Sequence, residues 1–369
     1  MQPQLKPKIE KATKKQFPDG IPDYGTDALR FTFAALASTG RDIRFDLNRI
    51  EGYRNFCNKI WNAARFVLMN VEGREIATGP AALASPGLAD RWILSRFGKT
   101  IEALDTHLAA YRFDLAARAL YEFAWNEYCD WYLELTKPIL QDPATPPAEQ
   151  AITRRTLVTV LEGLLRALHP FMPFITEEIW QRVAPLAGAC GDSIMTQSWP
   201  DPAAFPVDEA AESELAWIRN FILGVRQIRG EMDISPGKRI PVLLQDATDE
   251  DRRLLSIHER YLTELARLSG FEVLAAGSQP PPSATALVGS LKLLVPIAGL
   301  IDVAAERARL SKSRAKVAAD LARVEQKLAT ESFTSHAPEA VVAKEREREQ
   351  VLKRDLAKLD AQLEQLASL

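Results

Sequence analysis

The sequence predicts a mainly α protein that contains an antiparallel helical bundle, a small α/β module and a C-terminal antiparallel coiled-coil hairpin. Apolar residues recur at helical spacing over most of residues 26–185, and prolines separate the segments. Short apolar runs near residues 240 and 291 are bounded by turn residues, as strands are. From residue 310 to the end, leucine and valine recur at alternating steps of three and four, which is typical of a coiled coil.

The composition is that of an ordinary globular protein. The chain has 369 residues, 47% of them hydrophobic and 26% charged, which favours two to three domains and excludes a disordered or fibrous chain. No run reaches the roughly 18 apolar residues of a membrane span. The three cysteines lie far apart, and the first 20 residues are polar, so we expect a cytoplasmic protein without a zinc site, disulfide framework or secretory signal.

The N-terminal half is expected to form the bundle. Residues 1–25 are rich in proline and glycine and are expected to be an irregular linker. Thr26 and Asp27 can cap a first helix over 28–38, and a longer helix is expected from Asp46 to Asn70. Further helices are expected over 88–109, 111–136, 149–168 and 175–184, which completes an antiparallel bundle over 26–185. The aromatic residues between 121 and 132 are expected to lie mostly in its core.

The second half is expected to hold two further parts after a connector over 186–213. The α/β module, residues 214–300, combines helices over 214–229 and 249–268 with strands over 240–245, 271–274 and 291–297. Residues 301–369 are expected to form the hairpin, with a turn near Ser335, so that residues whose numbers sum to about 670 face each other. Basic residues then gather at its base, namely Arg307, Arg309, Lys312, Arg314, Lys316, Lys353, Arg354 and Lys358.

Charge is distributed unevenly along the chain. Residues 1–70 carry 12 Lys and Arg against 7 acids, so this segment is +5 and the remainder is −8. A basic region on an acidic whole favours an anionic partner that docks in one place, although a solvated lysine-rich tail explains the charge equally well.

The helix predicted over 46–70 has two distinct faces. The apolar face is formed by Tyr53, Phe56, Ile60, Ala64 and Val67. At 100° per residue, a second face contains Asn55, Lys59, Asn62 and Phe66, with Arg54, Asn58 and Arg65 beside it. An aromatic ring among cations and amides is suited to nucleic acid. The alternatives are that another helix covers Phe66 and that the asparagines pack between helices.

No active site can be assigned. The chain has no phosphate-binding loop motif, no dinucleotide fingerprint, no G-x-S-x-G and no H-E-x-x-H. Its four histidines lack metal-ligand spacing, and His169, which precedes Pro170 in an apolar stretch, is expected to be structural. We therefore expect no catalytic residues and no metal site.

Several segments resemble the C-terminal portion of the bacterial valyl-tRNA synthetases, a family of class I aminoacyl-tRNA synthetases. They are GTDALRF at 25–31, AALASTGRDI at 34–43, EGYRNFCNK at 51–59, WNA at 61–63, LHPFMPFITEEIW at 168–180 and IRGEM at 228–232. The resemblance covers nearly the whole chain. It implies that the bundle is of the class I anticodon-binding type and that the catalytic and editing domains of the family would lie upstream of Met1.

The resemblance implies tRNA(Val) as the partner, together with the missing catalytic domain in cis or in trans, and neither DNA nor a membrane. The parent enzyme uses ATP and Mg²⁺, but no cofactor site is expected in this chain, which is not expected to activate valine alone. In the anticodon site, Phe66 would stack on a base, Lys59, Arg54 and Arg65 would contact phosphates or base edges, and Asn55 and Asn62 would read an edge.

The hairpin of this family reaches the elbow of the tRNA. The resemblance implies phosphate contacts, which position the RNA without specifying its sequence, from Lys312, Arg314, Lys316, Arg323 and Lys327. Phe333 at the turn would touch the nucleic acid or cap the hairpin. Each of these lysines could equally lie on a solvated coiled-coil face.

The hypothesis is therefore the tRNA-binding part of a valine–tRNA ligase, which positions tRNA(Val) for ATP-dependent aminoacylation. A free-standing adaptor that binds RNA or protein without ligase activity is the alternative. A purely structural coiled-coil scaffold would leave the face around Phe66 without a role.

Overall fold

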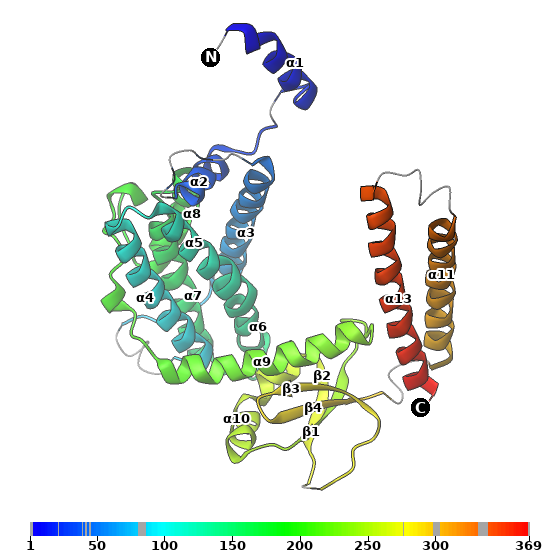
Figure 1. Cartoon of the computed structure of the whole chain (residues 1–369). Helices are drawn as coiled ribbons and strands as arrows, with labels where there is room; N and C mark the ends of the chain where they lie inside the picture. Colours follow the sequence, from blue (N-terminus) through cyan, green and yellow to red (C-terminus); the bar gives the residue numbers. More distant parts are fainter. Residues whose placement is uncertain are drawn as a thin grey trace. The chain divides into compact units, whose positions relative to one another are not determined.

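The structure is a computed structural model that describes residues 3–20, 22–38, 40, 43, 46–79, 86–275, 277–297, 303–330 and 339–367. The chain forms two compact units, Met1–Trp217 and Ile218–Leu369, and the boundary falls inside helix α9 (Glu209–Glu231) (Figure 1). Among the described residues, no helix is long and apolar enough to cross a membrane.

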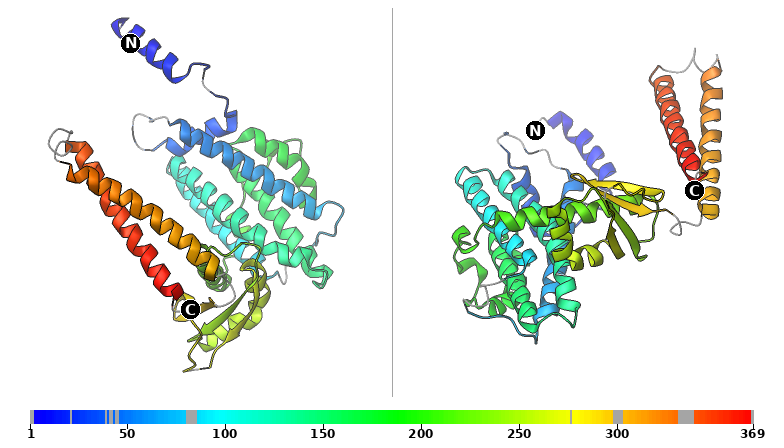
Figure 2. Two further views of the ribbon diagram at one scale, coloured as in Figure 1. Left: turned by 90° about the vertical axis from the view of Figure 1, so that its right-hand side faces the viewer. Right: turned by 90° about the horizontal axis from the view of Figure 1, so that it is seen from below.

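The first unit is the predicted helical bundle. Its longer elements are α1 (Lys6–Gln16), α2 (Thr26–Leu36), α3 (Leu47–Val71), α4 (Leu88–Ala109), α5 (Phe113–Glu122), η3 (Phe123–Tyr132), α6 (Leu133–Gln141), α7 (Pro147–Leu168) and α8 (Pro173–Ala187). Short 3₁₀ turns lie at η1 (Pro3–Leu5), η4 (Ile194–Thr196) and η5 (Pro202–Ala204). Helices α3, α4, α5 and α7 run side by side (Figures 1 and 2). The helices predicted over 46–70 and 88–109 match α3 and α4 to within one residue at each end.

The prediction of an irregular segment over 1–25 was wrong for Lys6–Gln16, which forms α1. Pro7 lies in the first turn of this helix, where its missing N–H costs nothing, so it starts the helix rather than breaking it. The eight residues that follow Pro7 contain no further proline and no glycine. The prediction failed because Pro7 occupies the first turn of the helix, where proline is compatible with helical backbone.

The aromatic run between 121 and 132 lies partly in a π-helix. Phe123, Tyr128, Trp131 and Tyr132 are buried, as predicted, whereas Tyr121 and Trp125 are half-buried. Element η3 has π-helical backbone hydrogen bonding, in which each N–H reaches one residue further back than in an α-helix. This wider turn joins α5 to α6 without a break and faces α3.

The second unit contains a four-stranded mixed sheet with the order β2-β1-β4-β3. Strands β1 (Ile240–Gln245) and β2 (Leu268–Val273) pair in parallel and are joined by α10 (Asp249–Leu265), whereas β3 (Ser283–Val288) and β4 (Leu291–Pro296) pair antiparallel. Gly224 on α9 leaves room for the sheet, since a Cβ there would lie 3.0 Å from Leu293 Cδ1. The parallel β1–α10–β2 crossover explains why β1 and β2 are separated by a helix in the sequence.

The strand β3 was not predicted. It follows three prolines, and its sequence SATALV has little alternation. A usable signal was present in Gly289 and Ser290, because Val288 pairs with Leu291 across these two residues and a Gly-Ser pair is typical of a two-residue hairpin.

The C-terminal part of the second unit is the predicted hairpin of α11 (Val303–Ala329) and α13 (Glu339–Ala367), which lie side by side (Figure 2). Leu310, Leu321, Val324 and Val342 are buried along its seam. The cross-hairpin ion pairs Arg314–Asp360 and Lys327–Glu345 have residue numbers that sum to 674 and 672, close to the predicted value. The turn near Ser335 lies outside the described residues.

Candidate nucleic-acid interface

Helix α3 is anchored by a cap and an apolar face. The Asp46 carboxylate accepts the N–H of Asn48 at 3.0 Å and caps the helix start. Phe56, Ile60 and Val67 are fully buried against the bundle, as their spacing predicted. With this face fixed, the side of α3 that carries its cations and amides must point outward.

The residues proposed to bind the anticodon all lie on this outer side. Arg54, Asn55, Asn62 and Arg65 are exposed. Lys59 and Phe66 are half-buried, because they lie at the edge of the exposed face, where α3 meets η3 and α6. One rigid helix therefore presents the whole predicted set.

Lys59 is engaged by two neighbours on η3. Its Nζ lies 2.5 Å from Asp130 Oδ1 and 4.6 Å from the centroid of the Trp125 ring. The ammonium group is therefore held by an ion pair with the carboxylate and by a cation–π contact with the indole ring. An RNA phosphate that binds Lys59 must compete with Asp130.

Phe66 lies two helical turns after Lys59 on α3 and also forms a cation–π pair with a residue of the neighbouring helix. Lys137 Nζ on α6 lies 5.8 Å from the centroid of the Phe66 ring and 2.5 Å from Glu134 Oε1. The alternative that another helix covers Phe66 is therefore partly confirmed. Helix α6 reaches the ring through Lys137 but leaves Phe66 half-exposed. The pairs 59–130 and 66–137 keep the same offset, so α3 runs in the same direction as η3 and α6.

Four residues of the candidate interface were not predicted from the sequence. Trp125, Asp130 and Lys137 come from another element and could not be paired with α3 before the helices were docked. Trp61 lies on α3 itself and is 43% exposed. Its position between Asn58 and Asn62 could have marked it, because it is far from the apolar stripe of the helix.

The hairpin residues proposed to bind the tRNA elbow fall into two groups. Lys312 and Lys316 are exposed and have no ion partner among the described residues. The other three are exposed but ion-paired within the hairpin, in the pairs Arg314–Asp360 (2.5 Å), Arg323–Asp320 (2.5 Å) and Lys327–Glu345 (2.6 Å). Phe333 lies outside the described residues.

The predicted concentration of positive charge at the hairpin base is weaker than expected. Asp360 lies against Arg314, and Lys353 pairs with both Glu325 and Glu349. Acids from the facing helix therefore offset part of the basic run, which the linear sequence did not show. The side chains of Arg307, Arg309 and Lys358 lie outside the described part of the structure.

Two titratable groups of the bundle, His169 and Asp90, are engaged by hydroxyl groups within the chain. His169 Nδ1 lies 2.8 Å from the hydroxyl of Thr176, and burial lowers the pKa of this histidine. Burial raises the pKa of Asp90 to about 6, although the hydroxyls of Tyr132 and Thr153 donate to its carboxylate. Among the described residues, no group of three or more His, Cys, Asp or Glu could hold a metal ion.

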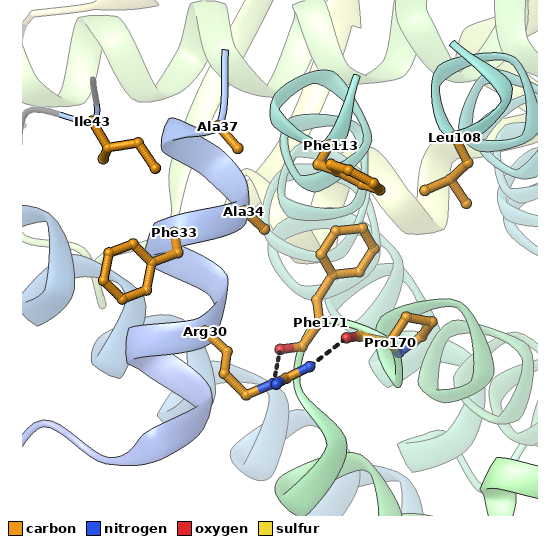
Figure 3. Close-up of a pocket in the computed structure, with 9 residues that line it drawn as sticks. All are labelled: Arg30, Phe33, Ala34, Ala37, Ile43, Leu108, Phe113, Pro170 and Phe171. Carbon is orange, nitrogen blue, oxygen red and sulfur yellow. Dashed lines mark hydrogen bonds between the residues drawn. The ribbon is translucent and has the colours of Figure 1, made fainter. Parts of the chain in front are cut away.

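A pocket of about 540 Å³, which no residue of α3 lines, lies between α2, α4, α5 and the turn that joins α7 to α8 (Figure 3). Apolar side chains dominate its lining, which consists of Arg30, Phe33, Ala34, Ala37, Ile43, Leu108, Phe113, Pro170 and Phe171. The Arg30 guanidinium donates to the carbonyls of Pro170 (2.9 Å) and Phe171 (3.3 Å), so two of its five N–H groups are used within the chain. Among the lining residues given above, Arg30 is the one cation and none is Asn or Gln, so this pocket is less suited to RNA than the outer side of α3.

A second pocket, of about 450 Å³, opens beside the N-terminal half of α3. Arg54, Cys57 and Asn58 form one wall, and Phe174, which is 64% exposed, forms another. The Asp27 carboxylate in this pocket accepts the backbone N–H groups of Phe174 (3.2 Å) and Ile175 (2.7 Å), so its charge stabilises the start of α8.

Two family models match the chain. The model described as the anticodon-binding domain of tRNA ligase matches residues 90–244, and the model described as the valyl tRNA synthetase tRNA binding arm matches residues 302–367. Among solved structures, the chain is similar to a LeuRS–tRNA–LeuAMS ternary complex from Agrobacterium radiobacter K84, with 14% sequence identity and a TM-score of 0.36. That match covers 69% of this chain and 30% of the other, so this chain spans under a third of that protein's length. Helix α3 lies outside both ranges matched by the family models.

Proposed function

Because the chain carries the anticodon-binding domain of a tRNA ligase and the tRNA-binding arm of a valyl-tRNA synthetase, we propose that it is the tRNA-binding part of a valine–tRNA ligase. It holds tRNA(Val) so that the acceptor end meets a catalytic domain, in cis or in trans. That domain supplies the sites for valine, ATP and Mg²⁺. The three cysteines are free thiols, which fits our proposal that the protein acts in the cytoplasm.

The observation that carries this proposal is the occurrence of both tRNA-binding domains on one chain, over 90–244 and 302–367. The exposed face of α3 supports it, since Phe66 offers an aromatic surface beside Arg65 and Asn62. Base stacking on such a ring contributes on the order of 1–3 kcal/mol, and amides can read a base edge. Lys312 and Lys316 on the hairpin are suited to phosphates, which position the RNA.

A binding titration tests this function. The chain is mixed with a valine tRNA transcript and with the same transcript carrying a swapped anticodon, each at 50 and 200 mM salt. We expect tighter binding to the native anticodon and loss of this preference in Phe66→Ala. Phe113→Ala is the matched control, because Phe113 is an exposed phenylalanine of the same unit outside α3.

Three outcomes of this titration distinguish between the possible functions. Preference for the native anticodon that depends on Phe66 supports the anticodon-reading role. Equal, salt-sensitive binding to both transcripts would contradict anticodon reading by this chain and leave a phosphate-binding protein. Absence of binding to either transcript would overturn the tRNA-binding proposal.

A further inference from the structure

The outer side of α3 has a crest that is separate from the edge facing η3 and α6. We define the α3 crest as Arg54, Asn58, Trp61 and Arg65. Steps of four, three and four residues place these side chains in one line along the helix, over a rise of about 16 Å. We call the side of α3 that meets η3 and α6, with Lys59 and Phe66, the Phe66 edge. Phe66 is turned about 100° away from Arg65, so the crest and the Phe66 edge face different directions.

The crest is exposed, and the one acid of its own helix, Glu51, lies three residues before Arg54. All four of its side chains are exposed, and Trp61 is 43% exposed although it is a large aromatic residue. Between Gly52 and Val71, α3 has three cations and no acid. Neither arginine of the crest makes an ion pair with a described residue, in contrast to Lys59, which is paired with Asp130.

Asp23, Asp27 and Glu51 lie near the N-terminal end of the crest, and the first two accept hydrogen bonds from the backbone. Arg54 and Asn58 line the pocket of about 450 Å³, where Asp23 Oδ1 accepts the N–H of Gly25 at 2.9 Å and Asp27 accepts two N–H groups of α8. Glu51 lies one turn before the crest and is exposed. From Asn58 to Arg65 the crest therefore presents positive charge, an amide and an indole without a competing carboxylate on α3.

This combination suits the sugar–phosphate backbone of paired RNA. Guanidinium groups pair with phosphates, and an amide and an indole N–H donate to ribose or phosphate oxygens. Side chains on a convex helix cannot enter the deep, narrow major groove of A-form RNA, so paired RNA is bound through its backbone and 2′-hydroxyls. Unpaired bases, in contrast, stack on aromatic rings, and the half-exposed Phe66 offers such a ring beside Lys137.

We propose that the α3 crest binds the backbone of the paired stem that carries the anticodon loop, while the Phe66 edge receives the loop. This inference rests on the proposed function, because it assigns a second part of the same RNA to the same helix. It gives Arg54 and Arg65 a role that is independent of the anticodon sequence. It also gives Trp61, which no comparison assigns, a backbone-binding role.

The test compares the double variant Arg54→Gln/Arg65→Gln with the unaltered chain on native and swapped-anticodon transcripts. Two phosphate contacts should reduce the slope of log affinity against log salt by about 1.4–1.8, equally for both transcripts. For each transcript, the ratio of the unaltered chain's affinity to the variant's affinity should then shrink about tenfold between 50 and 200 mM salt. Arg118→Gln/Arg182→Gln is the matched control, since it makes the same charge change at exposed positions on α5 and α8.

Two further readouts separate the stem from the loop. In hydroxyl-radical footprinting, the double variant should lose ribose protection in the stem and keep protection of the loop nucleotides. Trp61→Ala should weaken the binding of both transcripts equally. Trp61→Phe keeps an aromatic ring but loses the indole N–H, so it should weaken the binding of both transcripts equally and by a smaller factor.

The inference can fail without the proposed function failing. If the unaltered chain binds neither transcript, the proposed function fails first. If it prefers the native anticodon and the double variant loses affinity for that transcript alone, the crest belongs to anticodon reading and the stem assignment is wrong. An unchanged salt slope or unchanged stem protection would also overturn it.

Discussion

Lys59 on α3 and Trp125 on η3 form a cation–π pair, with the ammonium nitrogen 4.6 Å from the ring centroid. Asp130, five residues after Trp125, holds the same nitrogen at 2.5 Å. This lysine, which the sequence suggested as an RNA contact, thus already has partners in the free chain. Its contribution to binding depends on how readily a phosphate replaces the carboxylate.

Removal of that carboxylate charge should strengthen RNA binding. In Asp130→Asn, Lys59 stays above Trp125 but loses its competitor, and the protein gains one net positive charge at the interface. We expect a salt slope steeper by about 0.7–0.9 and tighter binding at 50 mM salt. Glu102→Gln on α4 makes the same charge change outside the interface and should leave the slope unchanged. A structural ion pair without an RNA role would give weaker folding and no gain in affinity.

Lys312 and Lys316, which have no ion partner among the described residues, should contribute to affinity without contributing to folding. In Lys312→Gln/Lys316→Gln, we expect the salt slope to fall by about 1.4–1.8 for native and swapped-anticodon tRNA alike. The unfolding temperature should stay within error, because neither residue pairs with a described acid. Equal slopes for the variant and the unaltered chain would place the RNA elsewhere on the hairpin.

Asp90 should make the stability of the bundle depend on pH. Burial raises its pKa from 3.8 to about 6, so folding favours the protonated carboxyl. This stabilisation is fully present below pH 3.8 and is lost as the pH rises through about 6. Asp90→Asn should remove the dependence, and its unfolding free energy relative to the unaltered chain should rise by about 2–3 kcal/mol between pH 4 and pH 8. Urea unfolding followed by near-UV circular dichroism measures this, and a pH-independent difference would contradict it.

Arg154 fastens the end of α3 to α7. Its guanidinium donates to the carbonyls of Asn70 (3.1 Å) and Glu75 (3.1 Å) and to Gln150 Oε1 (2.9 Å), and the residue is buried. Arg154→Ala leaves these part-buried acceptors without this donor and removes a buried side chain, so it should cost about 2–3 kcal/mol of unfolding free energy. Arg118→Ala, at a side chain that is 71% exposed, should change it by under about 0.5 kcal/mol. Similar urea midpoints for the two variants would contradict this role.

Gly98 marks the closest approach of a loop to α4. A Cβ at this position would lie 2.5 Å from the carbonyl oxygen of Phe205, which is backbone and cannot move cheaply. Gly98→Ala should therefore lower the unfolding free energy by about 1–3 kcal/mol. Gly52→Ala on α3, where nothing lies within 4 Å of the new Cβ, should raise it by about 0.5–1 kcal/mol. Thermal unfolding of both variants checks the sign of each change.

Local patterns in the sequence predict the helices and their buried faces well. Phe56, Ile60 and Val67 could be placed in the core because burial on one side of a helix depends on spacing alone. The same spacing placed Arg54, Asn55, Asn62 and Arg65 on the outer side, where they are exposed. What could be predicted of the interface is therefore the part contributed by one helix.

The remainder depends on tertiary packing. The π-helix η3 and the pairing of Lys59 with Asp130 need two helices in a definite register, which periodicity within either helix cannot supply. The hairpin ion pairs that neutralise part of the basic base likewise join residues far apart in the sequence, 46 positions in Arg314–Asp360 and 28 in Lys353–Glu325.

The constant offset of 71 residues between α3 and its neighbour, seen for Lys59 with Asp130 and for Phe66 with Lys137, makes the interface sensitive to insertions and deletions. Loss of one residue between Asp130 and Lys137 would rotate everything after it by about 100°. Lys137 would then leave the Phe66 ring, while Lys59 and Trp125 would stay together. Relatives of this chain should therefore tolerate substitutions within this seven-residue interval far better than changes in its length.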